Sequence, residues 1–276
     1  IQFFSHPFIK KIEEFINPRA ILTSNTSTIP RASLVEKMSD SLASRFLITH
    51  FFNPPRYLPL LEIVAGTEVE EDLFHRFSIF AREKLGKRVT ICNDSPGFIG
   101  NRLGIYFVQR AIAAALDYGF TVEQTDAMLG RPIGLPKTAV FGLMDLVGID
   151  LVPQVVNSMV ENLPSTDPLH KIAGKGQEII EQMIEDGYTG RKGKGGFYRL
   201  NTDGEKRIKE ARNLIDGSYE TADRSAGFPS AKIGKQGLLR LMSCPDQGAA
   251  FVKEILLDTF VYACELIPSV SDRSEE

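Results

Sequence analysis

The sequence predicts an α/β fold over its first third, followed by an all-α region. Two observations carry this prediction. Over residues 1–94, segments with helical periodicity alternate with short β-prone runs, which is the pattern of a sheet with crossover helices. From residue 98 onward, apolar residues recur at helical spacing over segments that are too long for ordinary strands.

The first elements end at a polar cluster. Residues 8–16 have helical spacing, and the run 20–24 is β-prone and leads into Asn25, Thr26 and Ser27. Ligands of open α/β sheets bind beyond the carboxyl ends of the strands, so Asn25 and Ser27 are candidate binding residues. They could equally make local turns and cap the helix expected at residues 31–39. The residues alone leave both interpretations open.

The stretch from residue 47 to residue 64, LITHFFNPPRYLPLLEIV, organises the chain. It has an apolar run that ends at His50, a proline-bounded turn, and a second apolar run that carries Glu62. This pattern predicts strand, loop, strand, in which the two side chains can meet across the pair. A carboxylate that holds one ring nitrogen fixes the tautomer and makes the other nitrogen a better proton acceptor. The sequence has only four histidines, and a lone histidine beside aromatic residues is more often structural.

A further helix and strand complete the α/β part. Residues 70–85 have one apolar stripe and a stop at Gly86, and residues 88–92 form a short strand. The next ten residues, NDSPGFIGNR, resemble a hinge, in which Ser95 could cap the following helix. Asn101 lies near the start of that helix, where its amide could reach a cleft or satisfy loop backbone.

The rest of the chain is predicted to be helical. A capping box is expected at Thr121–Gln124, because a Gln lies three residues after the Thr. The segment TGRKGKGGFY, residues 189–198, lacks the ending of a phosphate-binding loop and is interpreted as a turn with a solvated basic edge. Helices are expected at residues 98–118, 150–163, 176–186, 205–215 and 251–266, with a polar linker at 216–229.

Composition narrows the classes of function. The length of 276 residues suits two domains, and a net charge of −3 gives no reason to expect nucleic acid as a partner. The three cysteines have no metal-ligand spacing, and we expect no metal and a reducing, cytoplasmic location. No apolar run reaches the roughly 20 residues of a membrane span. Ile1 and the abrupt ends suggest a piece of a longer protein.

Five motifs in one order resemble those of the 3-hydroxyacyl-CoA dehydrogenases of fatty-acid β-oxidation. They are SNTST (24–28), THFFNPP (49–55), LLEIV (60–64), DSPGFIGNRL (94–103) and GRKGKGGFY (190–198). The resemblance covers roughly residues 1–200 and implies a partial Rossmann-type, doubly wound sheet with a helical C-terminal domain. The helix near residue 250 is similar to the one near 102, as in the second helical repeat of large multifunctional β-oxidation proteins.

The resemblance also implies roles. His50 would take the proton of the substrate's 3-hydroxyl as hydride leaves C3 for NAD, and Glu62 would orient His50. Ser27 would hydrogen-bond the reacting oxygen, and Asn101 would hold the acyl portion. Asn25, Ser27 and Asn53 would line the cofactor side of the cleft.

The sequence departs from the family at the dinucleotide site. No Gly-x-Gly-x-x-Gly turn is present, although that motif holds the pyrophosphate. In the family it lies upstream, so we expect this chain alone to bind NAD poorly and to turn over little. The expected domains are 1–94 (C-terminal part of the NAD-binding domain), 95–200 (helical dehydrogenase domain), 201–249 (linker) and 250–276 (start of a second repeat).

Three functions follow from these expectations. The first is NAD-dependent oxidation of (3S)-3-hydroxyacyl-CoA to 3-oxoacyl-CoA, with a hydratase module elsewhere in the parent chain. The second is a non-catalytic docking module that forms a homodimer through the helical domain. The third is a related dehydrogenase of a non-CoA hydroxy acid, which activity on free acids would support.

Overall fold

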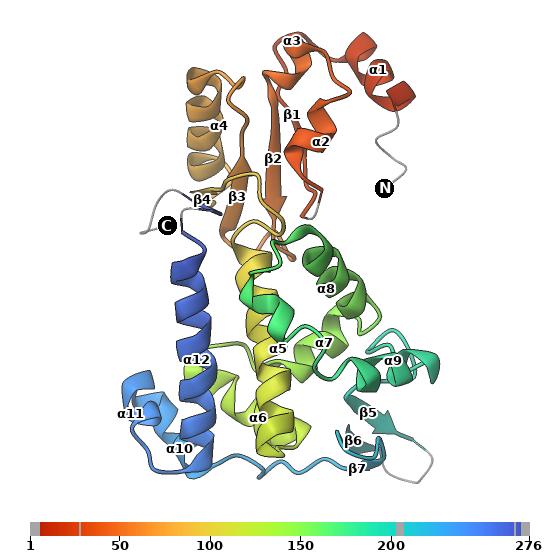
Figure 1. Cartoon of the computed structure of the whole chain (residues 1–276), viewed down its shortest axis with the longest axis vertical. Helices are drawn as coiled ribbons and strands as arrows, with labels where there is room; N and C mark the ends of the chain where they lie inside the picture. The colour runs from red at the N-terminus through yellow and green to blue at the C-terminus, as the bar shows by residue number, and fades with distance from the viewer. Residues whose placement is uncertain (1–5, 28, 203–206, 268, 272–276) are drawn as a thin grey trace. The chain divides into compact units, whose positions relative to one another are not determined.

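The chain divides into two compact units. The computed structural model describes residues 6–27, 29–202, 207–267 and 269–271 (Figure 1). The first unit comprises Ile1–Leu103 and Ala263–Glu276, and the second comprises Gly104–Tyr262.

A four-stranded sheet forms the centre of the first unit. Its spatial order is β1-β2-β3-β4, with β1 paired parallel to β2 and β3 parallel to β4. The middle pair, β2 and β3, is antiparallel because a short loop joins the two strands, whereas a parallel pair needs a long crossover. The sheet is therefore mixed rather than wholly parallel. The strands are β1 (Leu22–Ser24), β2 (Phe46–Phe51), β3 (Leu60–Val64) and β4 (Arg88–Ile91).

Helices cover the sheet on both faces, as Figure 1 shows for α2 and α4. Alternate residues of β2 point to opposite faces. Phe46 and Ile48 pack with Leu34 of α2, whereas Leu47 packs with Ala81 of α4. Both faces are thus buried, which explains why β2 reads as a continuous apolar run. The helices are α1 (His6–Phe15), α2 (Arg31–Val35), α3 (Asp40–Ala43) and α4 (Glu71–Glu83).

The helix expected at residues 31–39 is instead two short helices. Ser39 caps the second one by accepting from the Leu42 N–H at 3.3 Å. The first is capped across the chain by Asp94, whose two oxygens accept from the N–H groups of Arg31 (2.7 Å) and Ala32 (2.8 Å). The alternative in which Asn25 and Ser27 cap this helix is therefore wrong.

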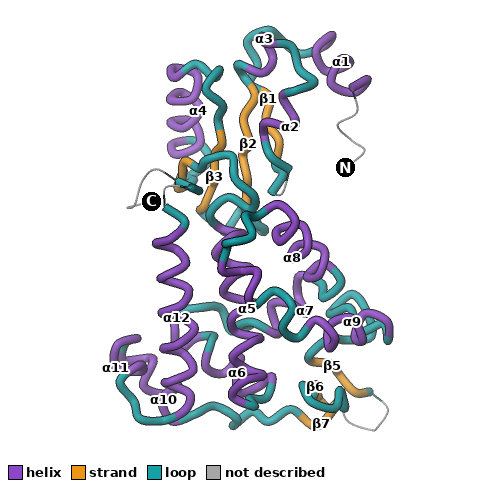
Figure 2. The backbone as a smooth tube through the Cα atoms, in the orientation of Figure 1, coloured by secondary structure: helices purple, strands orange, loops and turns teal. Residues whose placement is uncertain are grey.

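The second unit is mainly helical (Figure 2). The long helix α5 starts at Gly100 and not at Phe98, and Ser95 does not cap it, since the Ser95 hydroxyl has no partner among the described residues. The helices are α5 (Gly100–Tyr118), α6 (Val122–Met128), η2 (Arg131–Ile133), α7 (Phe141–Val147), α8 (Leu151–Asn162), η3 (Pro168–Lys171), α9 (Gln177–Glu185), α10 (Pro229–Ile233), η4 (Gly234–Gln236), α11 (Leu238–Met242) and α12 (Gln247–Glu265).

Two predicted helix signals are confirmed. Gly119 follows α5 with φ +66°, a conformation that glycine adopts without strain. Thr121 and Gln124 form the expected capping box, in which each side chain accepts from the other residue's backbone N–H.

The helix predicted at residues 205–215 is wrong. Residues 208–212 are the middle strand of an antiparallel sheet made of β5 (Tyr198–Asn201), β6 (Ile208–Arg212) and β7 (Tyr219–Thr221). Arg199 lies opposite Glu210 in this sheet, and their side chains form an ion pair at 2.6 Å. Cross-strand pairing of this kind stabilises a charged segment as a strand, and helical periodicity could not reveal it. Residues 203–206 lie outside the described part of the chain.

The glycine-rich segment is a turn, as predicted. Gly190 and Gly195 pair as a β-bridge, and Lys192 is exposed and forms an ion pair with Asp150. The carboxylate of Asp145 accepts from the N–H groups of Phe197 and Tyr198, each at 2.8 Å. The segment is therefore hydrogen-bonded to α7.

Among the described residues, no single helix has both the length and the apolar composition of a membrane span. The pair α7 and α8 reaches that composition only together, with a bend of 98° between them.

Candidate active site

The register of the β2–β3 pair places His50 directly opposite Glu62. Nδ1 of His50 lies 2.6 Å from Oε2 of Glu62, which is a short, charge-assisted contact. Because an ionised carboxylate can only accept, Nδ1 carries the ring proton in this pair. The two side chains predicted to meet therefore do meet, and the tautomer leaves Nε2 as the acceptor nitrogen.

Glu62 is completely buried, and both of its oxygens are used. Its Oε1 accepts from the backbone N–H groups of Ile99 (3.0 Å) and Gly100 (2.6 Å) at the start of α5. A buried carboxylate needs such donors, since burial removes its hydration. Both carboxylate oxygens of Glu62 thus accept hydrogen bonds, Oε2 from the ring N–H and Oε1 from two backbone amides.

The His50 ring lies against two phenylalanines. Its centroid is 4.5 Å from that of Phe52 and 6.0 Å from that of Phe98, both in tilted arrangements. His50 is 7% exposed, and its Nε2 has no partner among the described residues. The ring is therefore fixed by packing on its sides and by Glu62 at Nδ1, while Nε2 stays available.

The other predicted site residues lie at neighbouring element ends. Asn25 follows β1, and its Oδ1 accepts from the Phe51 N–H at 2.8 Å, so it fixes the end of β2 next to His50. Ser27 lies two residues further on and Asn53 is exposed in the β2–β3 loop, while Asn101 is the second residue of α5. In the described part of the chain, none of these four side chains hydrogen-bonds to His50 or Glu62.

The sequence did not reveal the backbone donors that hold Glu62. The signal was the segment PGFIG, in which a strand is followed by two glycines close to a helix start. A helix N-terminus offers free N–H groups, and it favours a carboxylate.

The residues present fit only one part of a dinucleotide site. Polar groups lie beyond the ends of β1 and β2, which is where a ligand of such a sheet binds. The glycine turn that would hold a pyrophosphate does not occur in the sequence. In the described residues, no group of three or more His, Cys, Asp or Glu side chains could hold a metal ion.

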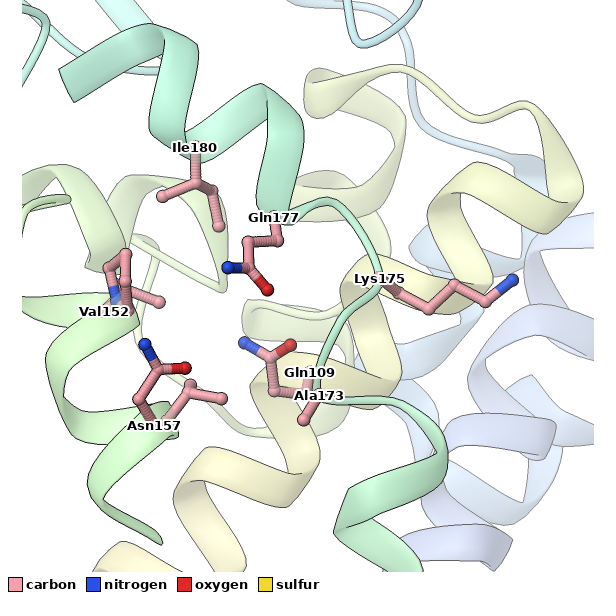
Figure 3. Close-up of a pocket in the computed structure, with 9 residues that line it drawn as sticks. Gln109, Val152, Asn157, Ala173, Lys175, Gln177 and Ile180 are labelled. Carbon is pink, nitrogen blue, oxygen red and sulfur yellow. The ribbon is translucent and has the colours of Figure 1, made fainter. Parts of the chain in front are cut away.

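A small pocket lies within the second unit, and none of its lining residues is a predicted site residue. Figure 3 shows the amide groups of Gln109, Asn157 and Gln177 around it. Gln109 is 2% exposed, and its Oε1 has no partner among the described residues. The pocket has room for little more than one water molecule, which suits hydration of the buried amide rather than a ligand.

The fold and the pair define the class: an α/β protein with a histidine–carboxylate pair on two neighbouring strands. The mixed sheet is flanked by helices, and the buried carboxylate fixes the orientation of the histidine ring.

Comparison with known proteins gives the family. The profile of the 3-hydroxyacyl-CoA dehydrogenase NAD binding domain matches residues 4–95, and that of the C-terminal domain matches residues 97–200. The chain belongs to the 3-hydroxyacyl-CoA dehydrogenase family.

Relatives include a protein of Rickettsia prowazekii named as a fatty acid oxidation complex trifunctional enzyme, which is 36% identical over 97% of this chain and 36% of its own length. A Deinococcus radiodurans protein named as a 3-hydroxyacyl-CoA dehydrogenase is 33% identical over 81% of this chain and 63% of its own. The chain thus spans about a third of the length of the trifunctional relative.

Solved structures are also similar to this chain. The crystal structure of M. tuberculosis FadB2 is 30% identical, with a TM-score of 0.59 over 72% of this chain and 66% of that one. The (S)-3-hydroxybutyryl-CoA dehydrogenase PaaH1 of Ralstonia eutropha is 25% identical, with a TM-score of 0.55 over 67% of this chain and 62% of that one.

Proposed function

We propose that the protein carrying this sequence oxidises (3S)-3-hydroxyacyl-CoA to 3-oxoacyl-CoA with NAD, in fatty-acid oxidation. The observation that carries the proposal is the 2.6 Å contact between Nδ1 of His50 and Glu62. It fixes the proton on Nδ1 and leaves Nε2 to accept a proton from a substrate hydroxyl.

His50 acts as the general base in this reaction. Nε2 takes the hydroxyl proton while the bond from C3 to its hydrogen breaks, and Glu62 stabilises the imidazolium that forms. When bound, NAD supplies the acceptor for the hydride that leaves C3. In the reverse direction, the protonated Nε2 returns its proton to the carbonyl oxygen.

The remaining predicted residues bind and orient. Ser27 hydrogen-bonds the reacting oxygen, and Asn101 holds the acyl portion of the substrate. Asn53 and the amide nitrogen of Asn25 face the cofactor side, since the Oδ1 of Asn25 is engaged by the Phe51 N–H. We also propose that domain boundaries lie at residues 94, 200 and 249.

The chain by itself binds NAD weakly and turns over little, because the glycine turn of a pyrophosphate site does not occur in its sequence. Titration of this chain with NAD tests that statement. A dissociation constant in the low micromolar range would contradict it.

The direct test is an assay of the whole natural protein that carries this sequence. NADH formation is followed with (3S)-3-hydroxybutyryl-CoA, with the free hydroxy acid as the matched substrate without CoA. We expect turnover of the thioester alone, and loss of that turnover in His50→Gln. Turnover of the free acid alone, or full activity in His50→Gln, would overturn the proposal.

The name of the trifunctional relative supports a parent with several modules, and the name of the Deinococcus radiodurans relative supports a CoA thioester as substrate. We propose that one of the other modules is a hydratase. We also propose that the helical unit forms a homodimer. Analytical ultracentrifugation of this chain across a concentration series tests that, and a monomer throughout would contradict it.

A further inference from the structure

The start of α5 contacts the candidate catalytic pair through its backbone. Oε1 of Glu62 lies 2.6 Å from the Gly100 nitrogen and 3.0 Å from that of Ile99. We propose that the first turn of α5 is a positioning clamp, in which the Gly100 N–H sets the orientation of Glu62 and thereby that of His50. This inference rests on the proposed function, because it concerns the same general base.

The chain takes an unusual path to present these amides. Gly97 and Phe98 both have left-handed backbone conformations, with φ +77° and +49°. Such a conformation is costly for a phenylalanine, and it persists where the surroundings impose it. The Phe98 side chain is 1% exposed, so burial of its ring holds the turn that aims the next two N–H groups at Glu62.

Gly100 allows α5 to approach the pair closely. A Cβ at this position would lie 2.4 Å from Cζ of Phe52, and the Phe52 ring is itself 4.5 Å from the His50 ring. Any side chain at position 100 must therefore displace Phe52, and Phe52 in turn contacts the base. The Gly100 N–H has a separate effect, because it donates a hydrogen bond directly to Glu62.

Two substitutions at this position separate the two effects. Gly100→Ala and Gly100→Pro add a Cβ at the same place, but only proline replaces the amide hydrogen, with its ring Cδ, and so ends the contact with Oε1 of Glu62. Proline is tolerated at the first position of a helix, so we expect α5 to form in this variant. Both are made in a Phe52→Leu background, which relieves the contact with the added Cβ. Gly104→Ala is the matched control, since a Cβ there meets nothing within 4 Å.

The kinetic readout uses the whole natural protein. We expect kcat of the proline variant to fall about 10- to 100-fold below that of the alanine variant, with KM for the acyl-CoA little changed. Gly104→Ala, made in the same Phe52→Leu background, should keep the kcat of that background. Equal kcat in the proline and alanine variants would overturn the inference.

A spectroscopic readout needs no turnover and uses this chain. With labelled histidine and glycine, we expect a low-field Nδ1–H signal of His50 in the parent and in the alanine variant, and its loss in the proline variant. The Gly100 amide proton should move upfield in Glu62→Gln, because its acceptor loses charge. An unchanged Gly100 signal in Glu62→Gln would overturn the clamp even if a proline variant failed to fold.

The two proposals fail in different ways. If the low-field signal responds as expected while the whole protein oxidises no hydroxyacyl-CoA, the clamp holds and the proposed function fails. If the protein is active but the proline variant keeps both its kcat and its low-field signal, the function holds and the clamp fails.

Discussion

Asp145 and Gly196 are packed so closely that no side chain fits between them. A Cβ added to Gly196 would lie 2.0 Å from Oδ1 of Asp145, the same oxygen that accepts from the Phe197 N–H. The glycine is therefore required by contact, and it allows the basic turn at residues 190–196 to close on α7.

Gly196→Ala should destabilise the second unit by about 1–3 kcal/mol, because the added methyl must push the Asp145 carboxylate out of its hydrogen bonds. Urea denaturation followed by circular dichroism measures this. Gly174→Ala is the control, since a Cβ there meets nothing within 4 Å, and it should leave stability unchanged or slightly raised. A stable Gly196→Ala variant would contradict the packing described here.

Asp145 should also give the second unit a pH-dependent stability. Burial raises its pKa from 3.8 to about 6, although the N–H groups of Tyr198 and Phe197 act in the opposite direction. Between these two values the unfolded chain is ionised while the folded chain still binds the proton. Raising the pH from 4 to 7 therefore removes up to about 3 kcal/mol of stability through this group.

The measurement compares the parent with Asp145→Asn from pH 4 to pH 7. The stability of the parent relative to the variant should decline as the pH rises, and it should level off above pH 6. Burial also raises the pKa of Asp126 to about 6. The stability of the Asp145→Asn variant therefore still declines with pH, with a smaller slope than that of the parent. A relative stability that rises with pH would contradict the raised pKa of Asp145.

Replacing Glu62 by Gln should impair turnover without weakening substrate binding. The amide can donate to Nδ1, which selects the tautomer with its proton on Nε2, and that tautomer cannot accept the hydroxyl proton. We expect kcat of the whole protein to fall about 10²–10⁴-fold. Steady-state kinetics with a hydroxyacyl-CoA checks this, and a large rise of KM with kcat preserved would show that Glu62 serves binding instead.

Asp94→Ala should destabilise the first unit by about 0.5–2 kcal/mol. The substitution leaves the N–H groups of Arg31 and Ala32 at the start of α2 without their acceptor. Thermal unfolding measures the effect, with Glu36→Ala as the control at the exposed end of the same helix. Equal melting temperatures of the two variants would show that Asp94 does not stabilise α2.

The sequence predicted the features that depend on local pattern. His50 and Glu62 could be paired because each lies in an apolar run and a short loop joins the runs, so the strands had to be antiparallel neighbours. The capping box at Thr121 is likewise complete within four residues.

Features that depend on contacts between distant segments were missed. Asp94 caps a helix that begins 63 residues earlier in the chain, and Glu62 accepts from Gly100, 38 residues later. The strand at 208–212 pairs with β5 on one side and β7 on the other, and Glu210 meets Arg199 across the sheet, whereas its own residues resemble a polar helix. No periodicity within one segment carries such information.

The antiparallel ladder between β2 and β3 has a consequence for evolution at this position. Side chains along a strand alternate between the two faces, so a shift of the pairing by one residue would send Glu62 to the α4 side of the sheet. Insertions within residues 52–59 that shift the ladder by an odd number of residues would separate Glu62 from His50. Length variation there has to be absorbed as an outward bulge of the loop, with the alignment of the two strands left intact.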